Sequence, residues 1–258
     1  AGNALWVRHD FQARRYTPAG GWASTAVVPT GSFFGSLVDA KLDAAGVVHM
    51  LRGGDGSAWH TSLSVTSGSY TAWSDAAGNA TAQRVQSDGV RLALGSNGSA
   101  MAVWRERNPG DSFDSVWASR RLASGAWQTP VRIEEVLTNA RERPALAIDD
   151  NGNAIAAWHQ GDSIYVNRFN ASAGTWGTAT EVDAGQVSST FGARVDLAMM
   201  GDGRAVLGWN SGLFAMKSLT YTPAAGFGAP VTVAPYSIDR SMGIDQQGRV
   251  VIVYRPPP

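Results

Sequence analysis

A large aromatic residue recurs about every 51 residues along the chain. Each one follows a short turn and precedes a stretch of small or polar residues. The recurring residues are Trp22, Trp73, Trp127, Trp176 and Phe227, at spacings of 51, 54, 49 and 51 residues. A fixed period of this length is typical of repeat architectures, in which each copy is one supersecondary unit that must stack on its neighbours. The period fits the 258-residue chain five times.

A glycine turn keeps the same period, and it lies between two apolar runs in every copy. The turn glycines are Gly46, Gly98, Gly152, Gly203 and Gly248. Six positions after the glycine, four copies have an aromatic residue: Trp104, Trp158, Trp209 and Tyr254. Arg52 takes that place in the copy that begins at Gly46. The apolar runs are short and bounded by glycine turns, which favours strands over helices.

Each repeat is predicted to contain four strands. A third run follows the aromatic position, and the fourth strand begins at the recurring tryptophan. The segment Phe11–Trp22 aligns without a gap to Val116–Trp127, which supports this division. The stretch from Arg132 to Arg143 is expected to be an extended loop between repeats. We therefore expect an all-β protein.

Stacked four-stranded units form either a closed ring or an open solenoid. The segment Ser241–Tyr254 supplies a first and a second strand, whereas the segment that begins at Gly2 supplies a second, a third and a fourth. Complementary ends favour a ring. The prediction is one domain over residues 1–258: a five-bladed β-propeller with four antiparallel strands per blade, closed by N- and C-terminal strands in one blade. The second strand occurs twice, and the sequence leaves open which copy closes the ring.

The segment Asp149–Trp158, with the sequence Asp-Asp-Asn-Gly-Asn-Ala-Ile-Ala-Ala-Trp, carries a resemblance that extends over essentially the whole chain through partial copies. It resembles bacterial β-propeller repeats of the type Asp-x-x-Gly-x-Ala-x-Ala-Val-Trp and is loosely similar to five-bladed, lectin-like propellers such as tachylectin-like proteins. The resemblance implies a blade and does not specify a ligand. The sialidase-type motif Ser-x-Asp-x-Gly-x-x-Trp is not intact in the chain.

By analogy with propeller families, ligands are expected on the rim formed by two sets of loops, those between second and third strands and those between fourth and first strands. The candidate ligand-binding residues are His9, Asp10, Arg52, Asp55, Trp104, Arg105, Trp158, His159, Asp162, Trp209 and Asn210. Aromatic residues next to polar ones suit saccharides, which stack on indole rings and present hydroxyl groups to polar side chains. The alternative is that Trp104, Trp158 and Trp209 pack between blades and that the polar residues simply end strands.

The sequence indicates no catalytic residue, no cofactor and no metal site. Asp43, Asp149 and Asp245 each lie three residues before a turn glycine, and this shared position predicts that they cap turn amides. The run that begins at Asp149 lacks the glutamate that completes a calcium-binding loop. The four histidines have no metal spacing, and the chain has no cysteine. The formal net charge of zero disfavours nucleic acid as a partner, and no apolar run is long enough for membrane insertion.

Three functions follow from this reading. The first is a non-catalytic, lectin-like protein that binds a glycan at the rim or in pockets between blades. The alternative is a protein-interaction or structural module of an extracellular or cell-surface assembly. A glycoside hydrolase or lyase is the least favoured. The expected location is extracellular, cell-surface or periplasmic.

Overall fold

A computed structural model describes most of the chain. The described residues are 4–7, 12–24, 26–27, 37–43, 45–54, 57–64, 74–76, 84–85, 89–107, 111–136, 138–185, 194–211, 215–237, 240–245 and 247–254. They form strands, turns and loops, and every strand pairing among them is antiparallel. No helix that can cross a membrane lies in these ranges. The expected all-β class is confirmed.

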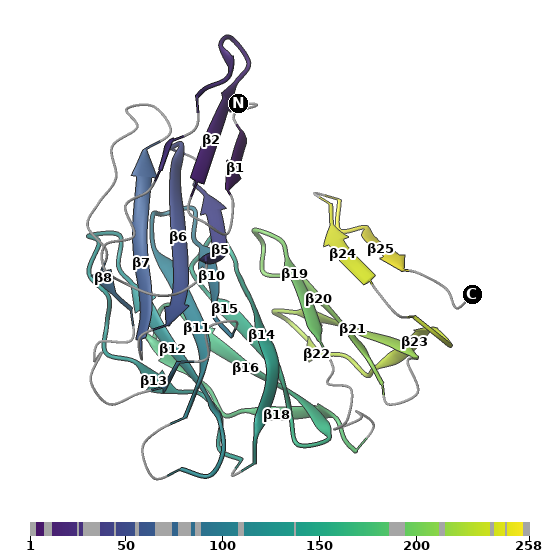
Figure 1. Ribbon diagram of the computed structural model, residues 1–258. Coiled ribbons are helices and arrows are strands. Elements are labelled where there is room, and N and C mark those ends of the chain that lie inside the picture. Colours follow the sequence, from purple (N-terminus) through teal and green to yellow (C-terminus); the bar gives the residue numbers. More distant parts are fainter. Residues whose placement is uncertain are drawn as a thin grey trace.

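The strands form six sheets, named A to F here, that follow one another along the chain (Figure 1). Sheet A contains β1 (Ala4–Val7), β2 (Gln12–Thr17), β3 (Gly21–Trp22) and β4 (Ala26–Val27). Sheet B contains β5 (Leu37–Leu42), β6 (Val47–Gly54), β7 (Ser57–Ser64) and β8 (Ser74–Asp75). Sheet C contains β9 (Arg84–Val85), β10 (Arg91–Leu94), β11 (Ala100–Arg107), β12 (Ser115–Arg121) and β13 (Val131–Arg132).

The last three sheets lie in the C-terminal half of the chain. Sheet D contains β14 (Ala140–Ile148), β15 (Ala154–Gln160), β16 (Ser163–Asn170), β17 (Thr175–Trp176) and β18 (Thr180–Asp183). Sheet E contains β19 (Val195–Met199), β20 (Ala205–Asn210), β21 (Met216–Thr222), β22 (Gly226–Phe227) and β23 (Val231–Ala234). Sheet F is the hairpin of β24 (Arg240–Ile244) and β25 (Val250–Tyr254).

The strand order within the sheets follows the predicted repeat. In sheet D, β14, β15 and β16 are the first three strands, and β17 and β18 together form the fourth. The five turn glycines have φ angles of 78° at Gly46, 80° at Gly98, 83° at Gly152, 89° at Gly203 and 81° at Gly248. This left-handed region favours glycine, so the predicted turns are confirmed. The expected loop that begins at Arg132 is shorter than predicted, because β14 already starts at Ala140 and pairs there with β15.

Neighbouring sheets stack through their first strands. The strands β5, β10, β14, β19 and β24 contact one another in chain order, and apolar side chains from facing sheets form the core between them. Sheet D shows both contacts: Trp158 packs against Met101 and Val103 of sheet C, whereas Ala157 packs against Leu207 of sheet E. Sheet D therefore buries one face against sheet C and the other against sheet E.

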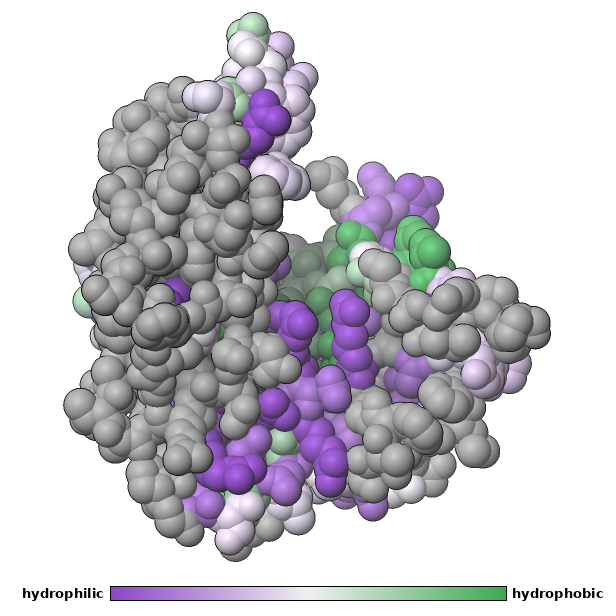
Figure 2. Space-filling model, in the orientation of Figure 1, coloured by the Kyte–Doolittle hydropathy of each residue, from purple (hydrophilic) through white to green (hydrophobic). Residues whose placement is uncertain are grey.

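The two ends of the stack are incomplete sheets. Sheet A has the second, third and fourth strand positions, and sheet F has the first and second. Sheet F contacts sheet E through β24 and β19, and sheet A contacts sheet B through β1 and β5. Among the described strands, none of sheet F pairs with one of sheet A, and the two parts stand apart with a hollow between them (Figure 2). The strand pairing that would close a ring is thus not among the described pairings.

Candidate functional site

A cleft of about 480 Å³ opens between sheets C and D. Its walls come from the third and fourth strands of both sheets: β12 and β13 on one side, β16 and β17 on the other. The side chains of this cleft include Ser119, Arg120, Gln128, Thr129, Val131, Arg132, Phe169, Thr175 and Trp176. Its volume lies within the range of small-molecule sites. We call it the C–D cleft.

An aromatic pair forms one wall of the C–D cleft. Phe169 on β16 pairs in register with Trp176 on β17, and their ring centroids are 5.6 Å apart. The tight turn between these strands is stabilised by Asn170, whose side-chain oxygen accepts hydrogen bonds from the backbone amides of Ser172 and Ala173. Phe169 is buried, whereas Trp176 is only partly buried. Trp176 therefore presents an indole surface to the cleft.

The same aromatic pair recurs in other sheets. Tyr16 and Trp22 in sheet A are 5.4 Å apart, and Tyr221 and Phe227 in sheet E are 4.7 Å apart. In sheet C, Arg121 takes the third-strand place opposite Trp127. The recurring fourth-strand aromatic residue thus packs on the end of the third strand.

Two arginines of sheet C reach the C–D cleft, and they differ in their partners. The guanidinium carbon of Arg120 lies 5.3 Å from the centre of the Phe169 ring, a cation–π contact. Arg132 instead bonds to the carboxylate of Glu134, with Nε and Nη2 each 2.6 Å from Oε1. In the described part of the chain, no carboxylate forms an ion pair with Arg120.

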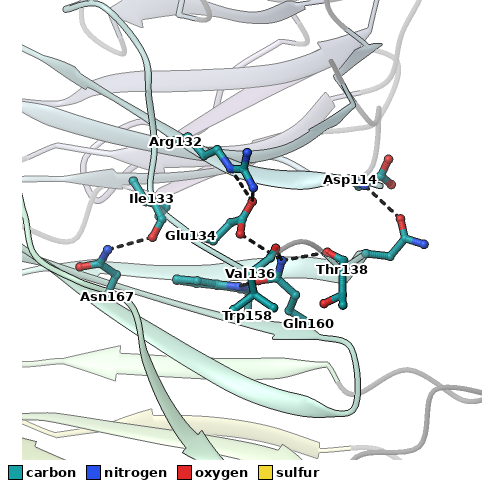
Figure 3. Close-up of polar contacts among 10 residues, drawn as sticks. Asp114, Arg132, Ile133, Glu134, Val136, Thr138, Trp158, Gln160 and Asn167 are labelled. Atoms are coloured by element: carbon teal, nitrogen blue, oxygen red, sulfur yellow. Dashed lines mark hydrogen bonds and ion pairs between the residues drawn. The ribbon is translucent and has the colours of Figure 1, made fainter. Parts of the chain in front are cut away.

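A buried polar network adjoins the cleft at Arg132 (Figure 3). Glu134 is almost fully buried, and its second carboxylate oxygen accepts a hydrogen bond from Nε2 of Gln160 at 3.2 Å. The same Nε2 donates to the carbonyl oxygens of Val136 and Thr138, and Oε1 of Gln160 accepts from the indole nitrogen of Trp158 at 2.8 Å. The amide of Gln160 thus joins sheet D to the loop after β13.

Asn167 joins the two walls directly (Figure 3). Its Nδ2 donates to the carbonyl oxygen of Ile133 at 2.8 Å and to that of Gly177 at 2.9 Å. Ile133 follows β13 of sheet C, whereas Gly177 follows β17 and lines the cleft. One buried side-chain amide thus bonds to the backbones of both sheets at this side of the cleft.

A smaller pocket of about 230 Å³ lies on sheet A between Trp6, Arg14 and Trp22. Arg14 Nε donates to the carbonyl oxygen of Ala23 at 3.1 Å, which holds the side chain across the sheet. Trp6 and Trp22 are 45% and 49% exposed. This pocket combines arginine with tryptophan, as the C–D cleft does.

The predicted rim tryptophans lie between sheets. Trp104, Trp158 and Trp209 have 0% exposure. Their indole nitrogens donate to Glu106 Oε2 at 2.7 Å, to Gln160 Oε1 at 2.8 Å and to Asp183 Oδ2 at 2.7 Å, respectively. The structure therefore places these rings in the packing between sheets. As ligand contacts they remain a prediction.

The polar residues predicted at the rim occupy several environments. Arg52 and His159 are buried, Arg105 and Asn210 are partly buried, and Asp162 is exposed. Burial lowers the pKa of His159 to about 4. The side-chain amide of Asn210 donates to the carbonyl oxygen of Ser237 at 2.6 Å. The predicted site residues His9, Asp10 and Asp55 lie outside the described residues. None of the predicted residues that the structure describes lines the C–D cleft.

The turn aspartates cap backbone amides as predicted. Asp149 Oδ1 accepts hydrogen bonds from the amides of Asn151 and Asn153. Asp43 Oδ1 accepts one from the amide of Val47, and Asp245 Oδ1 accepts from two amides of its own turn. The capping role is confirmed.

A chain of titratable groups lies between sheets B and C. Asp43 Oδ2 is 3.2 Å from Nε2 of His49, and Nδ1 of His49 is 3.1 Å from Nε2 of His60. The ring of His60 meets the edge of Trp127 at 5.4 Å. Burial lowers the pKa of both histidines, that of His60 to about 3. In the described part of the chain, no three histidine or acidic side chains form a group that can hold a metal ion.

No protein-family model matches the sequence, and no curated protein matches it. The chain is similar in structure to the lectin BP39L from Burkholderia pseudomallei, with a TM-score of 0.67, 10% identity and coverage of 99% of this chain and 79% of that one. It is also similar to the polysaccharide lyase Uly1, with a TM-score of 0.62, 11% identity and coverage of 98% and 71%. A third similar structure is the Dos1 propeller, with a TM-score of 0.55, 7% identity and coverage of 91% and 56%. The chain thus spans little more than half of the Dos1 propeller chain. These likenesses show a β-propeller fold.

Proposed function

We propose that this protein is a non-catalytic, lectin-like β-propeller that binds a saccharide in the C–D cleft. The observation that carries the proposal is the partly exposed indole of Trp176 beside Arg120 and Gln128 in one open cleft. Saccharides stack their C–H faces on such rings and hydrogen-bond their hydroxyl groups to planar polar side chains. The likeness to a lectin and to a polysaccharide lyase supports a saccharide as the ligand class.

The absence of catalysis belongs to the same proposal. Glycoside hydrolysis generally uses two carboxyl groups that flank the scissile bond, and the described residues that line the C–D cleft include no aspartate or glutamate. The nearest carboxylate of the network, that of Glu134, is almost fully buried and is bonded to Arg132 and Gln160. These arrangements favour binding over hydrolysis.

The proposal includes a five-bladed ring. Sheets B, C, D and E are four blades, and the first and second strand positions of sheet F complement the second, third and fourth positions of sheet A. Joined, these two form a fifth blade with one second strand to spare. Closure would cover the apolar side chains that show at the surface over β24 and β25 (Figure 2). We also propose an extracellular, cell-surface or periplasmic location, where glycans are accessible.

The test is a glycan array followed by calorimetric titration with the saccharides that bind. Trp176→Ala is expected to weaken binding at least about tenfold, because it removes the stacking surface. Val231→Ala is the matched control: Val231 is 59% exposed on sheet E, outside the C–D cleft, and its loss leaves binding unchanged. A protein that binds no saccharide on the array and in titration overturns the proposal.

A further inference from the structure

The charge in the C–D cleft is unbalanced. The described residues that line it include two arginines and no acidic residue. The Glu134 carboxylate neutralises Arg132 through contacts of 2.6 Å. Arg120 has its cation–π contact with Phe169 and no carboxylate bonded to it among the described residues. One positive charge in the cleft thus has no anionic partner within the described protein.

The position of Arg120 suits an anion. A guanidinium in a cation–π contact keeps N–H groups that can bond to the two oxygens of a carboxylate or a sulfate. The contact with Phe169 also restricts the side chain before a ligand arrives, which lowers the entropic cost of binding. Arg120 is partly buried, so an ion pair there is screened less by salt than one at an open surface.

The anion site and the stacking surface belong to the same ligand. Phe169 lies 5.3 Å from the Arg120 guanidinium carbon and 5.6 Å from the centre of Trp176. One short saccharide can therefore contact both groups. We propose that the C–D cleft selects acidic saccharides, stacked on Trp176 with a carboxylate or sulfate group bound by Arg120. This inference rests on the proposed function and specifies its ligand class.

The experiment compares an acidic saccharide with its neutral form. Calorimetric titration uses oligogalacturonate, its methyl ester and a sulfated galactan oligosaccharide at low ionic strength. We expect at least one of the two acids to bind about tenfold or more tightly than the methyl ester. The acid that binds more tightly shows whether the acidic group that the cleft prefers is a uronate or a sulfate ester. Raising the ionic strength should narrow the difference.

Two arginine variants make the test specific. Arg120→Gln should remove the preference for the acid and leave the weak binding of the methyl ester. Arg204→Gln is the matched control, because Arg204 bonds to Asp202 in an exposed turn of sheet E and should leave the preference intact. Urea unfolding of both variants establishes that each is folded.

Three outcomes overturn the inference. Equal binding of acid and methyl ester overturns the acidic selectivity while leaving the proposed function in place, provided that Trp176→Ala weakens both. A preference for the acid that survives in Arg120→Gln shows that another group binds the anion. If none of the three saccharides binds and the glycan array is also blank, the proposed function itself fails.

Discussion

The two interfaces of sheet D and the open faces of sheets A and F share one repeat pattern but differ in what covers them. In sheet D, Trp176 packs onto sheet C, and Ile155 is fully buried against sheet E. At the corresponding places, Trp22 of sheet A is 49% exposed and Val251 of sheet F is 58% exposed. The residue classes and strand positions are alike, so the difference comes from the neighbouring sheet. A single blade of this repeat does not bury its own faces.

The C–D interface and the open faces also differ in their polar contacts. The C–D interface has the hydrogen bonds of Gln160 and Asn167 in addition to its apolar contacts. The open faces offer mainly apolar surface, from Val251, Val253 and Trp6. Such exposed apolar surface generally marks an interface, and the proposed closure of the ring would supply one without a second protein.

The largest predicted effect is at the C–D interface. Trp158→Ala removes a fully buried indole and should lower the free energy of unfolding by about 3–5 kcal/mol, since it loses apolar burial and leaves a cavity. Urea denaturation followed by far-UV circular dichroism measures the change. Val231→Ala, at an exposed site on sheet E, should change stability by less than about 1 kcal/mol. Similar losses in the two variants would contradict a closed C–D interface.

Loss of the hydrogen bonds made by Gln160 should have the next largest effect on the free energy of unfolding. Gln160→Met keeps the volume but leaves Trp158 Nε1 and Glu134 Oε2 without the bonds that Gln160 makes. We expect a loss of about 2–3 kcal/mol, because unsatisfied buried polar groups are costly. Gln128→Met is the control. Because Gln128 is exposed, this substitution should change the free energy of unfolding by less than about 0.5 kcal/mol. An equal response in both variants would show that the network does not stabilise the interface.

The open faces provide a direct test of ring closure. Val253 is 66% exposed on β25 and Val231 is 59% exposed on β23. In a closed ring, Val253 lies against the next sheet, as Ala157 of sheet D lies against sheet E. Val253→Asp should then lower the free energy of unfolding by about 1–3 kcal/mol, because it places a charge in an apolar interface.

The same substitution at Val231 is the matched control and should cost less than about 1 kcal/mol. Chemical denaturation of both variants at one pH makes the comparison. If Val253→Asp costs no more than Val231→Asp, the ring is open at sheet F and the five-bladed closure is wrong.

The sequence was informative about the repeat because its determinants are local. The turn at Gly152 needs a left-handed glycine and a capping aspartate three residues earlier, and both features lie within one short motif. The continuous apolar run of β15 likewise follows from one strand that is buried on both faces. Such features repeat in every copy and are visible without knowledge of the neighbours.

The C–D cleft was not predicted because it depends on contacts between repeats. Arg120 and Phe169 are 49 positions apart in the sequence and meet only because two sheets stack. Glu134 lies in a segment that was expected to be only a loop, and its acidic side chain gave no sign of burial. The sequence did contain one indication of this site: the recurring fourth-strand aromatic residue together with an arginine near the end of the third strand. The analogy with other propellers placed the ligand on the rim and so did not include this pair.

The smallest predicted effect is a dependence of stability on pH. It should arise at the interface of sheets B and C and not through the polar contacts of sheets C and D. Asp43 accepts a hydrogen bond from Nε2–H of His49, so Nδ1 of a neutral His49 accepts one from Nε2–H of His60. The pKa values of both histidines in the folded state lie below the ordinary value of 6.5. The unfolded chain therefore takes up more protons as the pH falls below 6.5, and stability decreases with falling pH. Each histidine contributes a slope of up to about 1.4 kcal/mol per pH unit.

Replacing His60 with Gln keeps a donor toward His49 and removes one titrating group. The free energy of unfolding should then fall less steeply between pH 6.5 and pH 5, a window above most carboxylate pKa values. Gln128→Met leaves all histidines in place and should keep the slope of the unmodified protein. An unchanged slope in His60→Gln would mean that His60 is not held neutral between the sheets. A reduced slope would show that acid weakens the B–C interface through its histidines, whereas Gln160, which anchors the C–D interface, does not titrate.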